Sequence, residues 1–169
     1  MHRGRVVHFA DTPGLRPTPD RVRETLFNWL GQDLAGRTTL EPYAGSGVLS
    51  LEALSRGASA AVAIDQSAAA IRRLRETAEA MRIDALETQV GDALGILARE
   101  TRQFDVIFLD PPFGSDPWPR LLPLCVPRLV DGGFIYAEAP HALAVPAGLA
   151  VHRHGKAGRV HYHLLHRAS

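Results

Sequence analysis

The run Asp110-Pro111-Pro112-Phe113 places a carboxylate, two prolines and an aromatic ring directly after the apolar stretch from Phe104 to Leu109. Such a short apolar run predicts a buried parallel strand. Pro111 ends this strand, because proline has no N–H to donate to a sheet ladder. Asp110 therefore lies at the carboxyl end of a strand, the edge at which open α/β sheets bind ligands.

These four residues together suit a planar ring that carries an amino group. The Asp110 carboxylate and the Pro111 carbonyl are two hydrogen-bond acceptors, and the Phe113 ring offers a face for a base to stack on. Pro111 and Pro112 hold the backbone between them in a turn. The alternative interpretation is an ordinary strand end with a Pro-Pro turn and a core Phe, and the spacing alone leaves both open.

A glycine turn with a nucleotide-binding pattern lies in the first third of the chain. The short strand Thr38 to Glu41 leads into Tyr43-Ala44-Gly45-Ser46-Gly47, and an apolar helix from Val48 to Leu54 follows. Glycines let the backbone approach a ligand, and the N–H groups at a helix start point toward it. Ser50 stands where the dinucleotide fingerprint has its third glycine, so the pattern does not specify which nucleotide binds.

Two further acids end predicted strands on the same edge. Asp65 follows the strand Ala60 to Ile64, about twenty residues past the glycine turn, which is the spacing at which an acid meets ribose hydroxyls. Its alternative role is to cap the helix that comes next. Asp92 either bonds the amino group of an adenine or caps the helix that begins at Ala93, and the two roles are compatible.

The elements that position these residues alternate between strands and helices. This order predicts an α/β fold, with a doubly wound, Rossmann-like and mostly parallel sheet. A leucine-rich helix is expected up to about Leu129, and a fifth strand from Phe134 to Glu138. The chain then ends in an antiparallel hairpin over residues 149–166, which turns at Gly155-Lys156-Ala157-Gly158.

The first 36 residues are expected to form an N-terminal appendage, and residues 37–169 the sheet domain. The appendage has a predicted helix over residues 18–31, because Thr18 can cap it and Pro19 suits its first position. Both ends of the chain are basic, and no acid follows Glu138. The candidates for contacts with nucleic-acid phosphates are Arg16, Arg21, Arg23 and Lys156, although ordinary solvated arginines are the alternative.

Composition places the chain among globular proteins of one domain with a real core. It has 169 residues, of which 46% are hydrophobic and 22% charged, and a net charge of +1. Cys125 is the one cysteine, which excludes an internal disulfide and a cysteine zinc site. No apolar run reaches membrane-spanning length. We expect a cytoplasmic monomer that does not act at a membrane.

Four histidines alternate along the predicted hairpin and can share one face of it. A metal site needs three or four ligands in fixed geometry, so we expect no metal here and prefer an exposed surface close to RNA. These residues are His152, His154, His161 and His163.

The motifs resemble those of a known family. Asp110-Pro111-Pro112-Phe113 resembles the Asp/Asn-Pro-Pro-aromatic motif of amino-group methyltransferases that use S-adenosylmethionine (SAM), and the run from Glu41 to Gly47 resembles their SAM loop. The run from Arg16 to Leu30 is similar to the N-terminal signature of the bacterial 16S ribosomal RNA guanine-N2 methyltransferases. That family usually has Asp at Glu41, no proline at Pro42 and often an acid at Ala63.

The resemblance implies a class I SAM-dependent methyltransferase that acts on the exocyclic N2 of a guanine in 16S ribosomal RNA, free or in a small-subunit assembly particle. It implies that Asp110, Pro111, Pro112 and Phe113 are catalytic. The implied cofactor-binding residues are Glu41, Tyr43, Ala44, Gly45, Ser46, Gly47, Asp65, Gln66, Asp92 and Ala93. Two alternatives stay open: a DNA-directed or other amino-group methyltransferase with the same residues, and a nucleotide-binding module without catalysis.

Overall fold

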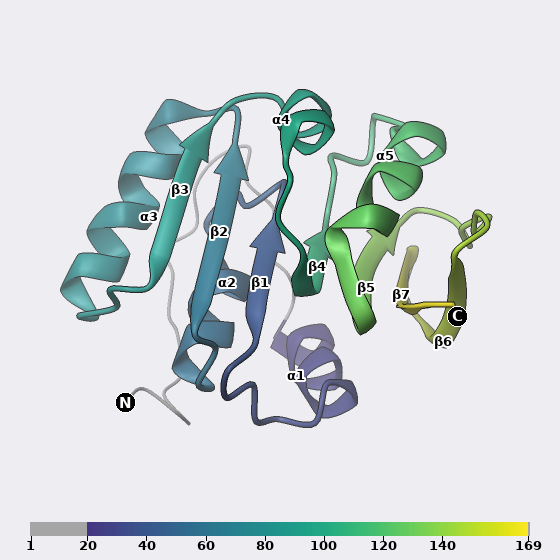
Figure 1. Ribbon diagram of the computed structural model, residues 1–169, viewed down its shortest axis with the longest axis horizontal. Coiled ribbons are helices and arrows are strands. Elements are labelled where there is room, and N and C mark those ends of the chain that lie inside the picture. The colour runs from purple at the N-terminus through teal and green to yellow at the C-terminus, as the bar shows by residue number, and fades with distance from the viewer. Residues whose placement is uncertain (1–19, 169) are drawn as a thin grey trace.

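One sheet of seven strands organises the protein (Figure 1). The structure is a computed structural model, and it describes residues 20–168. The strands are β1 (Thr38–Glu41), β2 (Ala60–Asp65), β3 (Leu86–Val90), β4 (Phe104–Leu109), β5 (Leu129–Ala139), β6 (Leu149–Ala157) and β7 (Val160–Arg167).

The strand order is β3-β2-β1-β4-β5-β7-β6, and the first five strands are parallel. β7 and β6 complete the sheet as an antiparallel hairpin, so the predicted fold class is confirmed. The direction of winding reverses between β1 and β4. In doubly wound sheets the ligand crevice lies at this switch point, outside the carboxyl ends of the strands.

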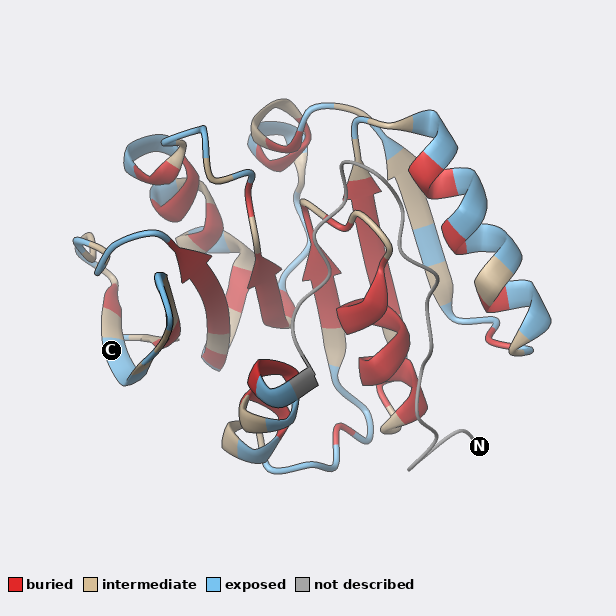
Figure 2. Cartoon of the chain, turned by 180° about the vertical axis from the view of Figure 1, so that it is seen from behind, coloured by how far each residue is buried: buried red, intermediate tan, exposed pale blue. Residues whose placement is uncertain are grey.

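Helices cover both faces of the sheet and enclose two apolar cores. The first core lies under α1, α2 and α3, and the second under α4 and α5. Figure 2 shows that α2 is buried along its whole length, whereas only one side of α3 is. The helices are α1 (Asp20–Trp29), α2 (Val48–Ser55), α3 (Ala68–Ala80), α4 (Ala93–Arg99), α5 (Trp118–Cys125) and the 3₁₀ turn η1 (Val126–Arg128).

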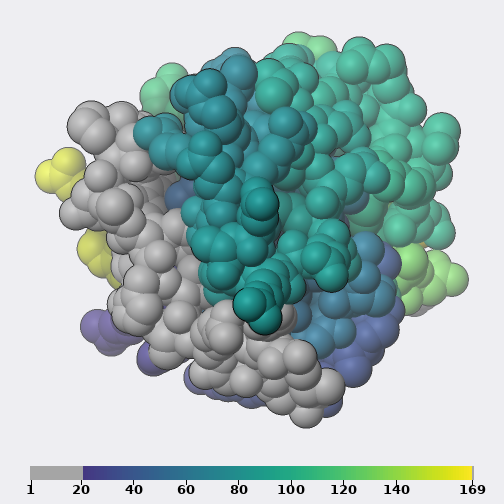
Figure 3. All heavy atoms as spheres, turned by 90° about the vertical axis from the view of Figure 1, so that its left-hand side faces the viewer, coloured from purple at the N-terminus to yellow at the C-terminus, as the bar shows by residue number. Residues whose placement is uncertain are grey.

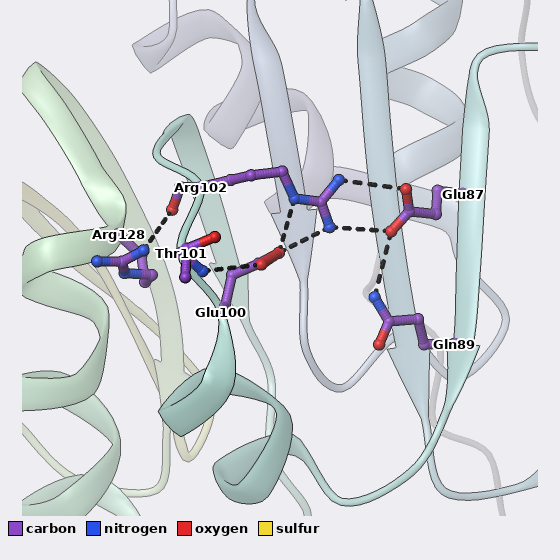
Figure 4. Close-up of polar contacts among 6 residues, drawn as sticks. All are labelled: Glu87, Gln89, Glu100, Thr101, Arg102 and Arg128. Atoms are coloured by element: carbon purple, nitrogen blue, oxygen red, sulfur yellow. Dashed lines mark hydrogen bonds and ion pairs between the residues drawn. The ribbon is translucent and has the colours of Figure 1, made fainter.

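The outer side of α3 and the neighbouring edge strand β3 make up much of the face seen in Figure 3. Polar contacts tie this edge to the centre of the sheet (Figure 4). The Arg102 guanidinium binds Glu87 of β3 at 2.9 Å and Glu100 at 2.7 Å. The backbone carbonyl of Arg102 accepts a hydrogen bond from the Arg128 guanidinium. Because Arg102 and Glu87 are about half exposed, the contact between them fixes geometry more than it stabilises the fold.

The predicted end of the leucine-rich helix was wrong by several residues. α5 includes Pro123 and stops at Cys125, and η1 follows, because Pro127 removes a backbone donor that a longer helix needs. The strand that follows begins at Leu129 instead of Phe134. The register between β4 and β5 shifts in this region, so the predicted glycine turn is an irregular part of the strand.

The C-terminal hairpin has a tighter turn than predicted. Gly158 and Arg159 alone separate β6 from β7, and Gly158 has a φ of 60°. Gly155 lies inside β6 instead of in the turn. A Cβ there would lie 2.5 Å from the Tyr162 ring, so this glycine leaves room for the ring to lie across the strand.

Helix α1 packs on the sheet through its apolar side. Leu26 and Phe27 are fully buried, and the Phe27 ring lies 6.2 Å from the Phe108 ring of β4. Gly31, with a φ of 93°, follows the helix end as predicted. Thr18, Pro19 and Arg16 lie outside the described residues, so the start of this helix and the appendage stay predictions.

We predict that Gly133→Ala destabilises the protein by roughly 1–3 kcal/mol. A Cβ at Gly133 would lie 2.9 Å from the Val130 carbonyl oxygen and 3.1 Å from that of Asp105, and neither backbone atom can move aside freely. Urea unfolding measures the change. Gly114→Ala is the matched control, because a Cβ at Gly114 meets nothing within 4 Å. Equal stability of the two variants would contradict the prediction.

Candidate active site

Acidic side chains line the carboxyl ends of four adjacent strands. In the sheet register Phe108 is level with Tyr136, and Leu109 with Ala137. Asp110, one residue further on, is therefore level with Glu138. Asp65 ends β2 and Glu41 ends β1, between β2 and β4. The predicted acids at residues 41, 65 and 110 thus meet at one edge, around the switch point.

Glu41 is buried beneath the glycine turn, with 4% of its surface exposed. Its Oε1 accepts hydrogen bonds from the Ser50 hydroxyl at 2.6 Å and from the Ser50 N–H at 3.1 Å. The second bond satisfies a donor in the first turn of α2. Burial raises the pKa of the Glu41 carboxyl to about 8, although the bonds from Ser50 oppose the shift. Glu41 thus holds the turn from below.

The Asp65 carboxylate organises the other side of the glycine turn. One oxygen accepts from the Gly45 N–H at 3.0 Å, and the other accepts from the Ser67 N–H at 2.9 Å. The Ser67 hydroxyl accepts from the Ala70 N–H and caps α3, so the alternative role of Asp65 as the helix cap falls to Ser67. Asp65 is partly exposed, and Gln66 beside it is exposed.

The glycine turn itself is fixed by backbone geometry. Gly45 and Gly47 have φ values of 55° and 74°, which favour glycine. A Cβ at Gly47 would meet the Leu74 side chain at 2.4 Å, so this position lacks a side chain because of the core beneath it. Ala44 is buried and Ser46 is partly exposed, which leaves the outer side of the turn accessible.

Asp92 and Tyr43 flank the turn on the side of the second core. The Asp92 carboxylate accepts from the Gly95 N–H at 2.9 Å and so caps α4 one residue before the buried Ala93. Tyr43 is half-buried, and burial together with the Asp92 charge raises the pKa of its hydroxyl to about 12. The capping role that we predicted for Asp92 is confirmed.

The Asp110 turn leaves the sheet at the predicted place. β4 ends at Leu109, and Pro111 is buried while Pro112 is exposed. The Pro112 carbonyl accepts from the Ser115 hydroxyl at 2.7 Å and from its N–H at 3.1 Å, which closes the loop. Asp110 and Phe113 are both partly exposed. Because β4 pairs with β1, the Asp110 turn leaves the sheet next to the glycine turn that follows β1.

Two basic residues from opposite ends of the chain line one cavity. Arg21 lies in the first turn of α1 and Lys156 near the tip of the hairpin, and both are exposed. The cavity has a volume of about 250 Å³, and none of its lining residues is acidic. They are Arg21, Val22, Thr25, Lys156, Ala157, Gly158 and Tyr162.

The structure separates Arg23 from this pair. Arg23 is 8% exposed, and its Nε lies 3.8 Å from the Glu52 carboxylate, so its side chain points into the protein. Such a position does not fit the phosphate contact that its sequence position suggested. A single helix turn carries both arginines, and the sequence does not show which of them faces the core.

His154, His161 and His163 share one face of the hairpin, as predicted, but they are not all exposed. His152 does not join them: the register shifts between Val151 and Arg153, and its ring lies against Phe134 and His166 on the other face. The rings of His154 and His163 stack at 4.6 Å. His163 is buried, and its Nδ1 lies 3.2 Å from the Ala137 carbonyl while its Nε2 accepts from the Leu143 N–H. Burial lowers the pKa of His163 to about 4, so this residue is a neutral structural link. Within residues 20–168 no group of three metal-ligating side chains is found.

Sequence reasoning missed Glu138. This residue is 2% exposed, and its Oε1 accepts a hydrogen bond from the Tyr136 hydroxyl at 2.6 Å. The available signal was the same as for Asp110: an apolar strand that ends in an acid, with Pro140 close behind. It identifies a fourth carboxylate at the same edge of the sheet.

The arrangement defines the class of the protein. A parallel sheet with a glycine turn, an acid at the end of β2 and an Asp-Pro-Pro-Phe turn after β4 is the Rossmann-like methyltransferase fold. The structure of a putative methyltransferase from Escherichia coli superposes with a TM-score of 0.85 at 37% identity, covering 93% of this chain and 90% of that one. No helix among residues 20–168 has the length and apolar character to cross a membrane.

The family follows from the sequence comparison. Residues 1–166 match the model of the family described as conserved hypothetical protein 95, and the chain belongs to this family. The protein named ribosomal RNA small subunit methyltransferase D in Escherichia coli is 38% identical over 98% of this chain and 86% of its own length. The putative rRNA methyltransferase YlbH of Bacillus subtilis is 31% identical, over 85% of this chain and 82% of its own.

We predict that Glu41 makes stability fall as the pH rises. The carboxyl has a pKa of about 8 when folded against an ordinary value of 4.5, so the folded state holds a proton that the unfolded state releases. The protonated Glu41 contributes to the free energy of unfolding. This contribution is fully present below pH 4.5 and is lost as the pH rises through 8, with a slope of at most about 1.4 kcal/mol per pH unit.

Glu41→Gln keeps an acceptor for Ser50 but does not titrate. The free energy of unfolding of this variant relative to the native protein should therefore grow between pH 5 and pH 8, as measured by urea unfolding at each pH. Glu76→Gln on the exposed side of α3 is the control and should follow the native curve. Parallel curves for Glu41→Gln and the native protein would show that the buried carboxyl is not protonated.

Proposed function

We propose that this protein transfers a methyl group from SAM to the exocyclic N2 of a guanine in 16S ribosomal RNA. The observation that carries the proposal is the position of Asp110-Pro111-Pro112-Phe113, beside the glycine turn at the switch point of the sheet. The relative at 38% identity, whose name specifies the small-subunit ribosomal RNA, supports RNA as the substrate.

The residues around the glycine turn suit the cofactor. The turn presents backbone and small side chains, and the partly exposed Asp65 and the exposed Asp92 supply acceptors for ribose hydroxyls and an adenine amino group. When bound, SAM supplies an electrophilic methyl group. The proposed contacts are Tyr43, Ala44, Gly45, Ser46, Gly47, Asp65, Gln66, Asp92 and Ala93, with Glu41 holding the turn from below.

The Asp110 turn orients the guanine. The Asp110 carboxylate and the Pro111 carbonyl accept the two N2 hydrogens, which directs the nitrogen lone pair toward the methyl group. The Phe113 ring stacks on the base, which must be unpaired or flipped out to enter. With SAM bound, transfer of its methyl group to N2 would leave the demethylated thioether, and the N2 cation would release one proton to water. The protein contributes alignment and the placement of charge.

The cavity between α1 and the hairpin is the proposed contact for the RNA backbone. Arg21 and Lys156 bring two positive charges to a concave surface without acids, which suits phosphate groups. Arg16 belongs to the same proposal from outside the described residues. Residues 1–36 then act as an appendage that faces RNA, although the apolar side of α1 also completes the core of the sheet domain, residues 37–169.

Two alternatives to the proposed function can be distinguished from it. A DNA-directed or other amino-group methyltransferase would use the same turn, but the motif order from Arg16 to Lys156 favours ribosomal RNA. A nucleotide-binding module without catalysis would bind NAD in preference to SAM. Calorimetry with the two cofactors distinguishes this last class.

The deciding experiment is mass mapping of 16S ribosomal RNA from cells that lack this protein. We expect one guanine to lose one methyl group, and the native gene to restore it. Asp110→Ala should not restore it, although its affinity for SAM should stay within about threefold, because the change removes only an acceptor for the base. An unchanged methylation map would contradict the proposal, and restoration by Asp110→Ala would contradict the role of Asp110.

Charge reversal in the cavity should weaken RNA binding. We predict that Arg21→Glu and Lys156→Glu each flatten the dependence of log K on log salt by about 0.7–0.9, the change for one lost phosphate contact. SAM affinity should be unchanged. The matched control is Arg72→Glu on the exposed side of α3, which should keep the native slope. Native slopes for Arg21→Glu and Lys156→Glu would show that the RNA backbone runs elsewhere.

A further inference from the structure

Glu138 is a buried carboxylate to which the proposed methyl transfer assigns no role. It is 2% exposed, and within residues 20–168 its hydrogen-bond donor is the hydroxyl of Tyr136, which is itself fully buried. The bond is 2.6 Å long and occupies one lone pair of Oε1. An ionised carboxylate has about four acceptor positions, so most of its capacity to accept hydrogen bonds remains.

The sheet register places this carboxylate beside Asp110. Leu109 of β4 pairs with Ala137 of β5, so the next residues, Asp110 and Glu138, are level with each other. Paired residues of neighbouring strands point to the same side of the sheet. The pKa of the Tyr136 hydroxyl is raised by burial and then by the charges of Glu138 and Asp110, which agrees with this closeness.

Burying the Glu138 carboxylate close to other acids costs free energy, and a purely structural role does not explain that cost. A buried carboxylate needs several hydrogen bonds to offset its lost hydration. Glu138 also lies near a second buried acid, because its charge contributes to the raised pKa of Glu41 after burial and Asp65. An apolar side chain of the same size as Glu138 would fill this place at lower cost. The retention of an acid here therefore points to a ligand with hydrogen-bond donors.

The edge of guanine has the donors that two adjacent acceptors require. Its N2 amino group lies next to the N1–H, so both point in one direction. Adenine has an amino group next to an unprotonated N1, whose lone pair a carboxylate repels. An Asp-Pro-Pro-Phe turn alone binds the amino group of either base, so recognition of guanine needs a further acceptor at N1.

We propose that the Glu138 carboxylate accepts the N1–H of the target guanine while Asp110 and Pro111 hold its N2. Glu138 is thus the residue that selects guanine over bases without a hydrogen at N1. The Tyr136 hydroxyl fixes the carboxylate in place. This inference rests on the proposed function, because it assigns the base specificity of that same site.

The test uses 2-aminopurine at the methylated position of a synthetic RNA. This base keeps the 2-amino group that receives the methyl but has no hydrogen at N1. In the native protein we expect kcat/KM for the 2-aminopurine RNA to be at least about tenfold lower than for the guanine RNA, the effect of losing a hydrogen bond to a charged acceptor. In Glu138→Leu, which has no acceptor for the N1–H, the two RNAs should differ by less than about threefold.

One control variant separates recognition from folding. Asp131→Asn changes a fully exposed acid on the same strand and should behave as the native protein does. Calorimetric SAM affinity checks that each variant is folded.

The outcomes are distinct. Equal rates of the native protein on both RNAs would overturn the role of Glu138 and leave methyl transfer to N2 intact. That role is also overturned if Glu138→Leu slows both RNAs by one factor, because a structural residue acts on every substrate alike. If the native protein methylates neither RNA, the proposed function itself fails.

Discussion

The parallel register of β2, β1, β4 and β5 is the constraint on which the rest of the structure depends. It brings the ends of four strands to one edge, and with them Asp65, Glu41, Asp110 and Glu138. These residues are up to 97 positions apart in the chain. The two apolar cores hold the strands in place from both faces, so side chains at the edge have little freedom to move.

Concentrating acids at a partly buried edge costs stability. The fold meets this cost with local donors: Ser50 bonds to Glu41, the Gly45 and Ser67 N–H groups bond to Asp65, and Tyr136 bonds to Glu138. Three of these partners belong to the glycine turn or to the helix starts beside it. The hydrogen bonds that offset the cost of burying these acids therefore also shape the proposed cofactor site.

Several elements were predictable because their signals are local. Pro111 had to end β4, and the bounds of β1 and β3 follow from short runs between turn residues. The end of α5 and the start of β5 were not predictable in this way. Pro127 interrupts a stretch that has the composition of a helix, and the irregular register after Leu129 depends on the pairing with β4. Gly155 lies inside β6 because it pairs with Tyr162, a contact across the hairpin that no local pattern shows.

The sequence by itself determined the class of fold, the order of its motifs and the types of group at each strand end, because periodicity and turn residues act over a few neighbouring positions. Only the tertiary structure decided which of these groups share an environment. It turned Arg23 inward and left Arg21 beside Lys156, buried His163 between two backbone partners, and set Glu138 next to Asp110. Burial and strand pairing are properties of residues far apart in the chain, and no local pattern contains them.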